Sequence, residues 1–148
     1  MLQSAGAAGA FTLAHNLFAS AAQTPASERI TVGAIGISGR GNYILNAFLQ
    51  YPDVQVVAVC DVIANRREAA KKMVDERYGN QDCRTYIDMR ELIAQPDIDA
   101  VMIATGDNNH SLISVLAARA GKDIYCEKPL SVTIAESRAV ADAVRRHA

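Results

Sequence analysis

A glycine-rich turn between two segments of different periodicity constrains the fold of this chain most. The β-branched run 29–35 enters the turn Gly36-Ile37-Ser38-Gly39-Arg40-Gly41, and residues 42–50 then repeat apolar side chains at helical spacing. A second β-like run, 54–60, ends at Asp61, which lies 25 residues after Gly36. A helix that begins in a glycine turn can bind phosphate at its N-terminus, and an acid after the next strand can accept from ribose hydroxyls. The pattern predicts a nucleotide-binding sheet.

The rest of the chain continues to alternate between strand and helix patterns. The run 54–60 is nearly continuous in valine, as in a parallel strand that is buried on both faces. Capping boxes begin two helices, and in the second of these Val140 and Val144 are expected to pack inward. The fold class expected is α/β, a doubly wound parallel sheet of the Rossmann type. Further strands are expected at 99–105 and 123–126, and further helices at 64–78, from 88 to about 95, at 111–120 and at 133–148.

Composition favours small-molecule partners. The chain has 15 Lys and Arg against 16 Asp and Glu, a formal net charge of −1, so it lacks the basic surface that nucleic acids or anionic membranes attract. A length of 148 residues favours one domain. The three cysteines, Cys60, Cys83 and Cys126, are far apart and form no CxxC pair, so no metal site is expected and the three are interpreted as buried thiols.

Residues 1–27 differ in composition from the dinucleotide-binding domain expected at 28–148. They are rich in Ala, Gly and Ser, and His15-Asn16 interrupts them too much for a membrane span. Ala19-Ser20-Ala21 fits the cleavage site of an export signal, although the positive n-region is absent. Met1-Leu2-Gln3 looks like the tail of a twin-arginine signal whose arginine pair lies upstream. We favour an export-signal remnant, which would make the protein periplasmic or exported. The alternative is a disordered segment at the start of a cytoplasmic protein.

The glycine turn is expected to bind the cofactor, although it departs from the G-x-G-x-x-G pattern. Gly36 and Gly41 hold the outer positions and Ser38 stands in the middle one, where it is small enough for a pyrophosphate to approach. An ordinary β-to-α turn is the alternative. Gly36→Val is expected to abolish cofactor binding while leaving the fold largely intact. The cofactor-binding residues expected in this turn are Gly36, Ser38, Gly39, Arg40 and Gly41.

Asp61 favours NAD over NADP as the cofactor. A carboxylate accepts from ribose hydroxyls and repels a 2′-phosphate. Arg66 and Arg67 are close in sequence, and an arginine is what a 2′-phosphate requires, so NADP stays open as the less favoured cofactor. In another interpretation, Asp61 only caps the helix that starts at Ala64.

Two further segments are expected at the carboxyl ends of strands. Thr105, Asn108 and His110 lie between a strand and a helix, where they can contact the ribose or phosphates, although a capping or surface role is favoured over catalysis for His110. Lys128 precedes Pro129 where the last strand ends, and Pro129 favours extended backbone there. We expect Lys128 to be catalytic, with a solvated loop lysine as the alternative. Glu127 is expected to pair with Lys128, to contact the cofactor or to be structural.

Taken together, these residues resemble the glucose-fructose oxidoreductase and inositol dehydrogenase (Gfo/Idh/MocA) family from about Ile30 to the C-terminus. The resemblance rests on the glycine turn with Arg40, on Cys60-Asp61, on 97–101 with Thr105 and His110, and on Gly121-Lys122 leading into 127–131. It implies an N-terminal NAD-binding domain followed by an α/β substrate domain that this chain lacks. Two departures are Ser38 and Gly106, where the family usually has glycine and proline.

The resemblance also implies a function for the whole protein. It would be an NAD-dependent oxidoreductase that transfers hydride between nicotinamide and a sugar, sugar derivative or polyol, and it would form a homo-oligomer. Lys128 would polarise the reacting oxygen or relay its proton, and the fragment alone would scarcely turn over. The alternatives are an NAD-dependent glycosidase of related fold and a non-catalytic NAD-sensing domain.

Overall fold

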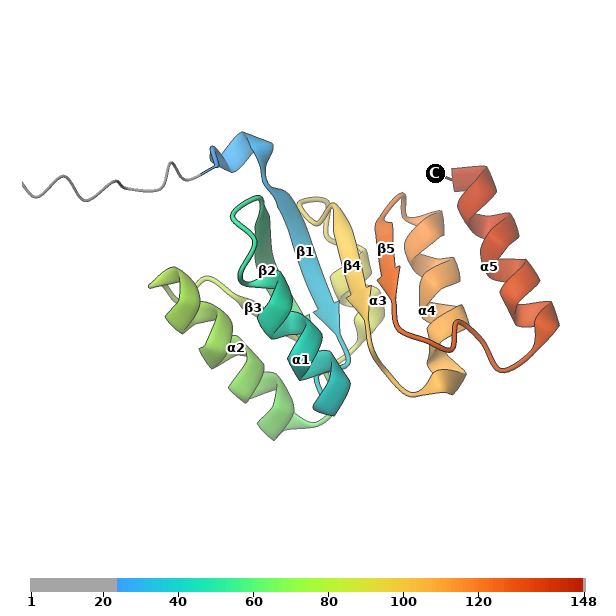
Figure 1. Cartoon of the computed structure of the whole chain (residues 1–148), viewed down its shortest axis with the longest axis horizontal. Coiled ribbons are helices and arrows are strands. Elements are labelled where there is room, and N and C mark those ends of the chain that lie inside the picture. The colour runs from blue at the N-terminus through green and yellow to red at the C-terminus, as the bar shows by residue number, and fades with distance from the viewer. Residues whose placement is uncertain (1–23, 148) are drawn as a thin grey trace, which may run out of the picture.

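Five parallel strands form one sheet in the order β3-β2-β1-β4-β5 (Figure 1). The computed structural model describes residues 24–147, so nearly all of the segment interpreted as an export-signal remnant lies outside the described residues. The strands are β1 (Ile30–Ile35), β2 (Val54–Cys60), β3 (Arg84–Tyr86), β4 (Ala100–Ile103) and β5 (Asp123–Cys126). The helices are α1 (Gly39–Phe48), α2 (Ala64–Tyr78), α3 (Met89–Ile93), α4 (Asp107–Arg119) and α5 (Ile134–His147), after a short 3-10 turn, η1 (Ala26–Glu28).

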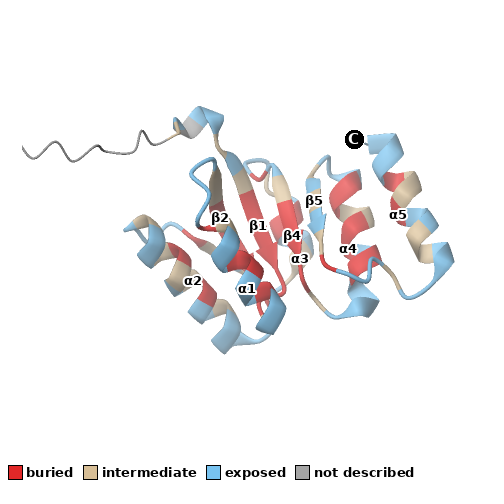
Figure 2. Ribbon diagram, in the orientation of Figure 1, coloured by how far each residue is buried: buried red, intermediate tan, exposed pale blue. Residues whose placement is uncertain are grey.

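Helices cover both faces of the sheet, which confirms the doubly wound architecture. On one face, Leu45 of α1 and Val74 of α2 pack with Val56 and Met102 of the sheet. On the other face, the helices α3 and α4 pack against the sheet through a second apolar cluster that includes Leu92 and Ile113. The buried residues accordingly concentrate in the central strands and on the inner sides of the helices (Figure 2). None of the helices within residues 24–147 has the length and apolarity that crossing a bilayer needs.

Most of the expected elements are present, and the differences have local causes. Strand β3 was not predicted, because Thr85 is exposed, the two residues beside it are only partly buried, and the three carry no apolar alternation. Helix α4 begins at Asp107, not at residue 111, since its first turn is polar and only later turns show apolar spacing. In α5, Val140 is buried as expected, but Val144 is 37% exposed and the neighbouring Ala143 packs inward instead.

The two expected capping boxes differ in the structure. At the start of α5, Thr133 Oγ1 accepts from the Glu136 N–H, and the Glu136 carboxylate accepts from the Thr133 N–H, so the box is reciprocal. At α3, the Asp88 carboxylate accepts from the backbone N–H and the guanidinium of Arg90. Asp88 therefore caps α3 without the reciprocal contact from Glu91 that a capping box needs.

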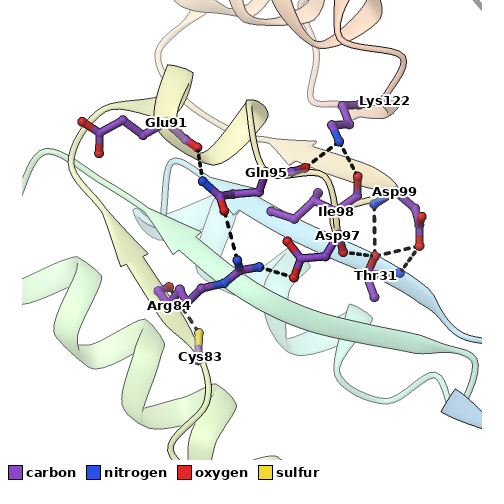
Figure 3. A network of polar contacts seen from close by, with 9 residues as sticks. All are labelled: Thr31, Cys83, Arg84, Glu91, Gln95, Asp97, Ile98, Asp99 and Lys122. Carbon is purple, nitrogen blue, oxygen red and sulfur yellow. Dashed lines mark hydrogen bonds and ion pairs between the residues drawn. The ribbon is translucent and has the colours of Figure 1, made fainter.

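A polar network joins loops at the amino ends of the strands, on the opposite edge from the glycine turn (Figure 3). Lys122 Nζ donates to the carbonyl oxygens of Gln95 and Ile98, both at 2.7 Å. Thr31 Oγ1 donates at 2.7 Å to the carboxylate of Asp99, and this bond holds the pKa of Asp99 below its ordinary value. The network fixes the segment between α3 and β4 against the rest of the sheet.

Replacing Lys122 with methionine is expected to destabilise the fold by about 2 kcal/mol. The substitution keeps the aliphatic stem but removes the two charge-assisted hydrogen bonds to carbonyl groups. Urea denaturation of the two proteins measures the difference. The matched control is Lys72→Met, because Lys72 is exposed on α2 and forms only a surface ion pair with Glu76. If the two substitutions lowered the free energy of unfolding equally, the structural role of Lys122 would be contradicted.

Candidate functional site

The register of the sheet brings the carboxyl ends of four strands together. Ile35 at the end of β1 pairs with Cys60 of β2 and with Ile103 of β4, and Ile103 pairs in turn with Cys126 of β5. Because the strands are parallel, the residues that follow these positions share one edge of the sheet. They are Gly36, Asp61, Ala104 and Glu127. Ligands of open α/β sheets bind at this edge, where the strand order reverses between β1 and β4.

Gly36 and Gly41 allow backbone segments to approach closely. Gly36 has a φ of +86°, and a Cβ there would lie 2.7 Å from the backbone nitrogen of Thr105. A Cβ on Gly41 would lie only 1.9 Å from the Gly36 carbonyl oxygen. A side chain at Gly36 would therefore collide with the backbone of Ala104 and Thr105, just after β4. The expectation that Gly36→Val leaves the fold largely intact is wrong, because this glycine is needed for the turn itself.

The N-terminus of α1 has room for an anion. The helix begins at Gly39, inside the glycine turn, and Ser38 is its N-cap with no hydrogen bond from its side chain to the helix. The first N–H groups of a helix have no partner within it. Apart from Gly39, its chain neighbours and the backbone of its own helix, no described atom lies within 4 Å of the place where a Cβ on Gly39 would stand. The turn thus offers backbone donors, a hydroxyl and open space, which is what a cofactor pyrophosphate requires.

Asp61 fastens the glycine turn to the end of β2. Its carboxylate accepts from the Ile37 N–H at 2.8 Å and from the Ile63 N–H at 2.9 Å, and the residue is only 8% exposed. The N-cap of α2 is Ile63, so Asp61 does not cap this helix in the usual way. Each carboxylate oxygen keeps lone pairs that can accept from a ribose hydroxyl. Arg67 donates to the Asp61 carbonyl at 2.7 Å, which occupies one of the two arginines considered for a 2′-phosphate.

Glu127 pairs with Arg40 of the glycine turn, where Lys128 was one of the expected partners. Arg40 Nε lies 3.0 Å from the Glu127 carboxylate, and the Arg40 guanidinium also lies 5.0 Å from the Tyr43 ring centre. The hydrogen bond from Arg40 lowers the pKa of Glu127 below its ordinary value, although partial burial opposes the shift. The pair joins the start of α1 to the end of β5. The sequence offered no signal for it, since the residues are 87 positions apart.

The three polar residues expected at the site in the segment after β4 differ from one another in how deeply they are buried. Thr105 is half-buried and Asn108 is exposed on the first turn of α4, whereas His110 is 1% exposed. The surface role favoured for His110 is therefore wrong, and its buried ring instead contacts two backbone carbonyls. Gly106, the N-cap of α4, has a φ of −69°, which proline also adopts. The backbone of this residue thus has the conformation that the family's proline would have.

Lys128 is exposed at the same edge of the sheet. Within residues 24–147, no hydrogen-bond or ion-pair partner is found for its ammonium group. Its peptide bond to Pro129 is cis. Because no partner among the described residues occupies the ammonium group, it can act as a donor to a ligand that binds over the strand ends.

The cysteines take no part in this site. Burial, reinforced by the Asp61 carboxylate, raises the pKa of the Cys60 thiol to about 12, and burial does the same for Cys83. Cys126 is only half-buried, contrary to the expectation of three buried thiols. In the described part of the chain, no group of three or more His, Cys, Asp or Glu residues is placed to hold a metal ion.

Comparison with known proteins identifies the family. A model of the GFO_IDH_MocA oxidoreductase family, described as an NAD-binding Rossmann fold, matches residues 30–148. An inositol 2-dehydrogenase from Salmonella typhimurium is 33% identical over 119 residues, which are 80% of this chain and 34% of that protein. A glycosyl hydrolase family 109 protein from Bacteroides thetaiotaomicron is 33% identical over 117 residues, 76% of this chain and 25% of that protein.

A solved structure agrees with these matches. Myo-inositol dehydrogenase from Lactobacillus casei, in complex with NAD(H) and myo-inositol, superposes with a TM-score of 0.69 at 28% identity and covers 78% of this chain and 33% of its own. The chain spans about a third of the length of the first relatives it matches. Together with the parallel sheet and its glycine turn, these matches show that the chain belongs to the GFO_IDH_MocA oxidoreductase family and contains its NAD-binding Rossmann domain.

Proposed function

We propose that this chain is the cofactor-binding part of an NAD-dependent oxidoreductase that acts on a sugar, sugar derivative or polyol. The observation that carries the proposal is the gathering of the glycine turn, Asp61 and Lys128 along one edge of the sheet, where β1 and β4 diverge. The names of the relatives support the substrate class, since they include inositol dehydrogenases and a levoglucosan dehydrogenase. The rest of such an enzyme would supply the substrate pocket.

Each group has a role that its placement supports. The N–H groups at the start of α1 bind the pyrophosphate, and the lone pairs left on the Asp61 carboxylate accept from the adenosine ribose. Arg40, held by Glu127, keeps its terminal guanidinium nitrogens for the phosphates. The bound nicotinamide supplies the hydride acceptor or donor. Lys128 donates a hydrogen bond to the substrate oxygen and stabilises the negative charge that develops there.

The cofactor preference is tested at Asp61. We expect the chain to bind NAD(H) more tightly than NADP(H), and Asp61→Asn to weaken NAD binding roughly tenfold or more, the cost of losing a charged hydrogen-bond acceptor. The ratio of the affinity for NAD(H) to that for NADP(H) should also fall, because the negative charge that repels a 2′-phosphate is gone. Calorimetric titration with both cofactors measures these affinities.

The control for this experiment is Asp82→Asn, which removes the same charge from an exposed residue and should leave both affinities unchanged. Equal or reversed affinities in the unmodified chain would refute the NAD preference and would direct attention to Arg66, which is exposed on the first turn of α2. Urea denaturation of Asp61→Asn is measured in parallel, since this side chain also holds the N–H groups of Ile37 and Ile63.

An NAD-dependent glycosidase is the second candidate, because three of the relatives are glycosyl hydrolase family 109 proteins. In such an enzyme the oxidation would be transient and no net NADH would form. Assays of the whole protein for NADH release from polyols and for glycoside cleavage separate the two activities. Cleavage without NADH release would replace the dehydrogenase proposal.

A further inference from the structure

The buried ring of His110 faces a carbonyl oxygen at each of its two nitrogens. Its Nδ1 lies 2.7 Å from the carbonyl oxygen of Pro129, and its Nε2 lies 3.1 Å from that of Thr105. The residue is 1% exposed. Both distances fall within hydrogen-bonding range, and a carbonyl oxygen can only accept.

A neutral imidazole cannot satisfy both of these contacts. It carries one N–H, so in either tautomer one nitrogen would turn a lone pair toward a carbonyl oxygen in a buried site. That arrangement loses a hydrogen bond and adds repulsion between two acceptors. The ring that carries both protons donates to both oxygens, and bonds from a charged donor are the stronger kind.

We propose that His110 carries both ring protons in the folded protein and acts as a positioning residue. In this form it ties the carboxyl end of β4, through Thr105, to the segment that carries Lys128, through Pro129. The strand pairing of β4 with β5 ends at Ile103 and Cys126, and one further backbone bond joins the Glu127 N–H to the Ile103 carbonyl. The His110 contacts join the two segments beyond that point. His110 then fixes Lys128 relative to the glycine turn without contacting a ligand itself.

The charges around His110 have opposing effects. Burial and the helix N-terminus oppose a positive ring, since His110 lies near the start of α4. The two carbonyl contacts favour it. The charged residues in the segments that His110 joins are Asp107 on the first turn of α4, and Glu127 and Lys128 after β5. Arg40 pairs with Glu127, so the two acidic and the two basic residues of this set balance. The observation that favours the doubly protonated ring is therefore its pair of carbonyl contacts.

The inference goes beyond the proposed oxidoreductase function and is tested without cofactor or substrate. The ring nitrogens of His110 are observed by 15N NMR of the chain at pH 7, and the signals are assigned by comparison with His110→Gln and with His147→Gln, the variant of an exposed histidine at the end of α5. Both nitrogens of His110 are expected to show the shifts of protonated N–H groups. A single protonated nitrogen would overturn the proposal.

The positioning role has its own measurement. In His110→Phe, which keeps an aromatic ring but removes both donors, amide hydrogen exchange at Glu127, whose N–H donates to the Ile103 carbonyl at 2.9 Å, is expected to become at least about tenfold faster, the ratio that one lost bond from a charged donor corresponds to. The α2 amides, remote from this segment, should not change. Unchanged exchange at Glu127 would refute the tie. If the variant does not fold, the NMR result on the unmodified chain still decides the protonation state.

Discussion

Lys128→Ala is expected to lower kcat roughly a hundredfold or more. The protein assayed is a full-length enzyme in which this chain is combined with a substrate domain of the kind expected from the family. The reason is the loss of an ammonium group that stabilises charge on the substrate oxygen, and removing one electrostatic donor of this kind has such an effect. The affinity for NAD should change far less, because the glycine turn and Asp61 are untouched. Steady-state kinetics with a parallel NAD titration measures both quantities.

Two comparisons make the Lys128 experiment specific. Lys128→Arg should rescue activity only in part, since a planar guanidinium cannot place a compact charge at the same point or readily give up a proton. Lys72→Ala, at an exposed position on α2, should leave kcat unchanged. A near-normal kcat for Lys128→Ala would make Lys128 a solvated loop lysine and would favour a domain that binds NAD without catalysis.

Gly36→Val is expected to destabilise the domain by roughly 4 kcal/mol and to abolish NAD binding. A Cβ at this position would lie within 2.8 Å of backbone atoms of Ala104 and Thr105, and a φ of +86° is strained for a β-branched side chain. Steric overlap and backbone strain each cost about 1–3 kcal/mol. Urea denaturation and calorimetry with NAD measure the two effects.

Gly106→Val is the matched control for this experiment. Gly106 is the N-cap of α4 in the adjoining segment and has a φ of −69°. Apart from Gly106 and its chain neighbours, no described atom lies within 4 Å of the place where its Cβ would stand. The same substitution there should cost only about 1 kcal/mol, the usual size of an unfavourable replacement at a helix N-cap. A stable Gly36→Val variant that binds NAD normally would place the cofactor away from the glycine turn.

The order and type of most elements could be predicted from the sequence, because they rest on local properties. The valine-rich β2, the Gly79 that ends α2 with a φ of +69°, and the reciprocal capping box of α5 each depend on residues close together in the chain. The glycine turn and Asp61 also follow from spacing, and so does their place at the carboxyl ends of parallel strands. Strand β3 was missed, since its short edge pairing with β2 leaves no pattern in three residues.

The tertiary structure decided which distant residues meet and how deeply each is buried. No local pattern joins Arg40 to Glu127, or sets His110 between Thr105 and Pro129, because these contacts exist only once β1, β4 and β5 lie side by side in register. The same holds for Gly36, where a side chain is excluded by the backbone of Ala104 and Thr105, which follow β4. Chemistry at the strand ends is thus encoded by single residues and their spacing, whereas the partners that orient those residues depend on the packing of segments far apart in the chain.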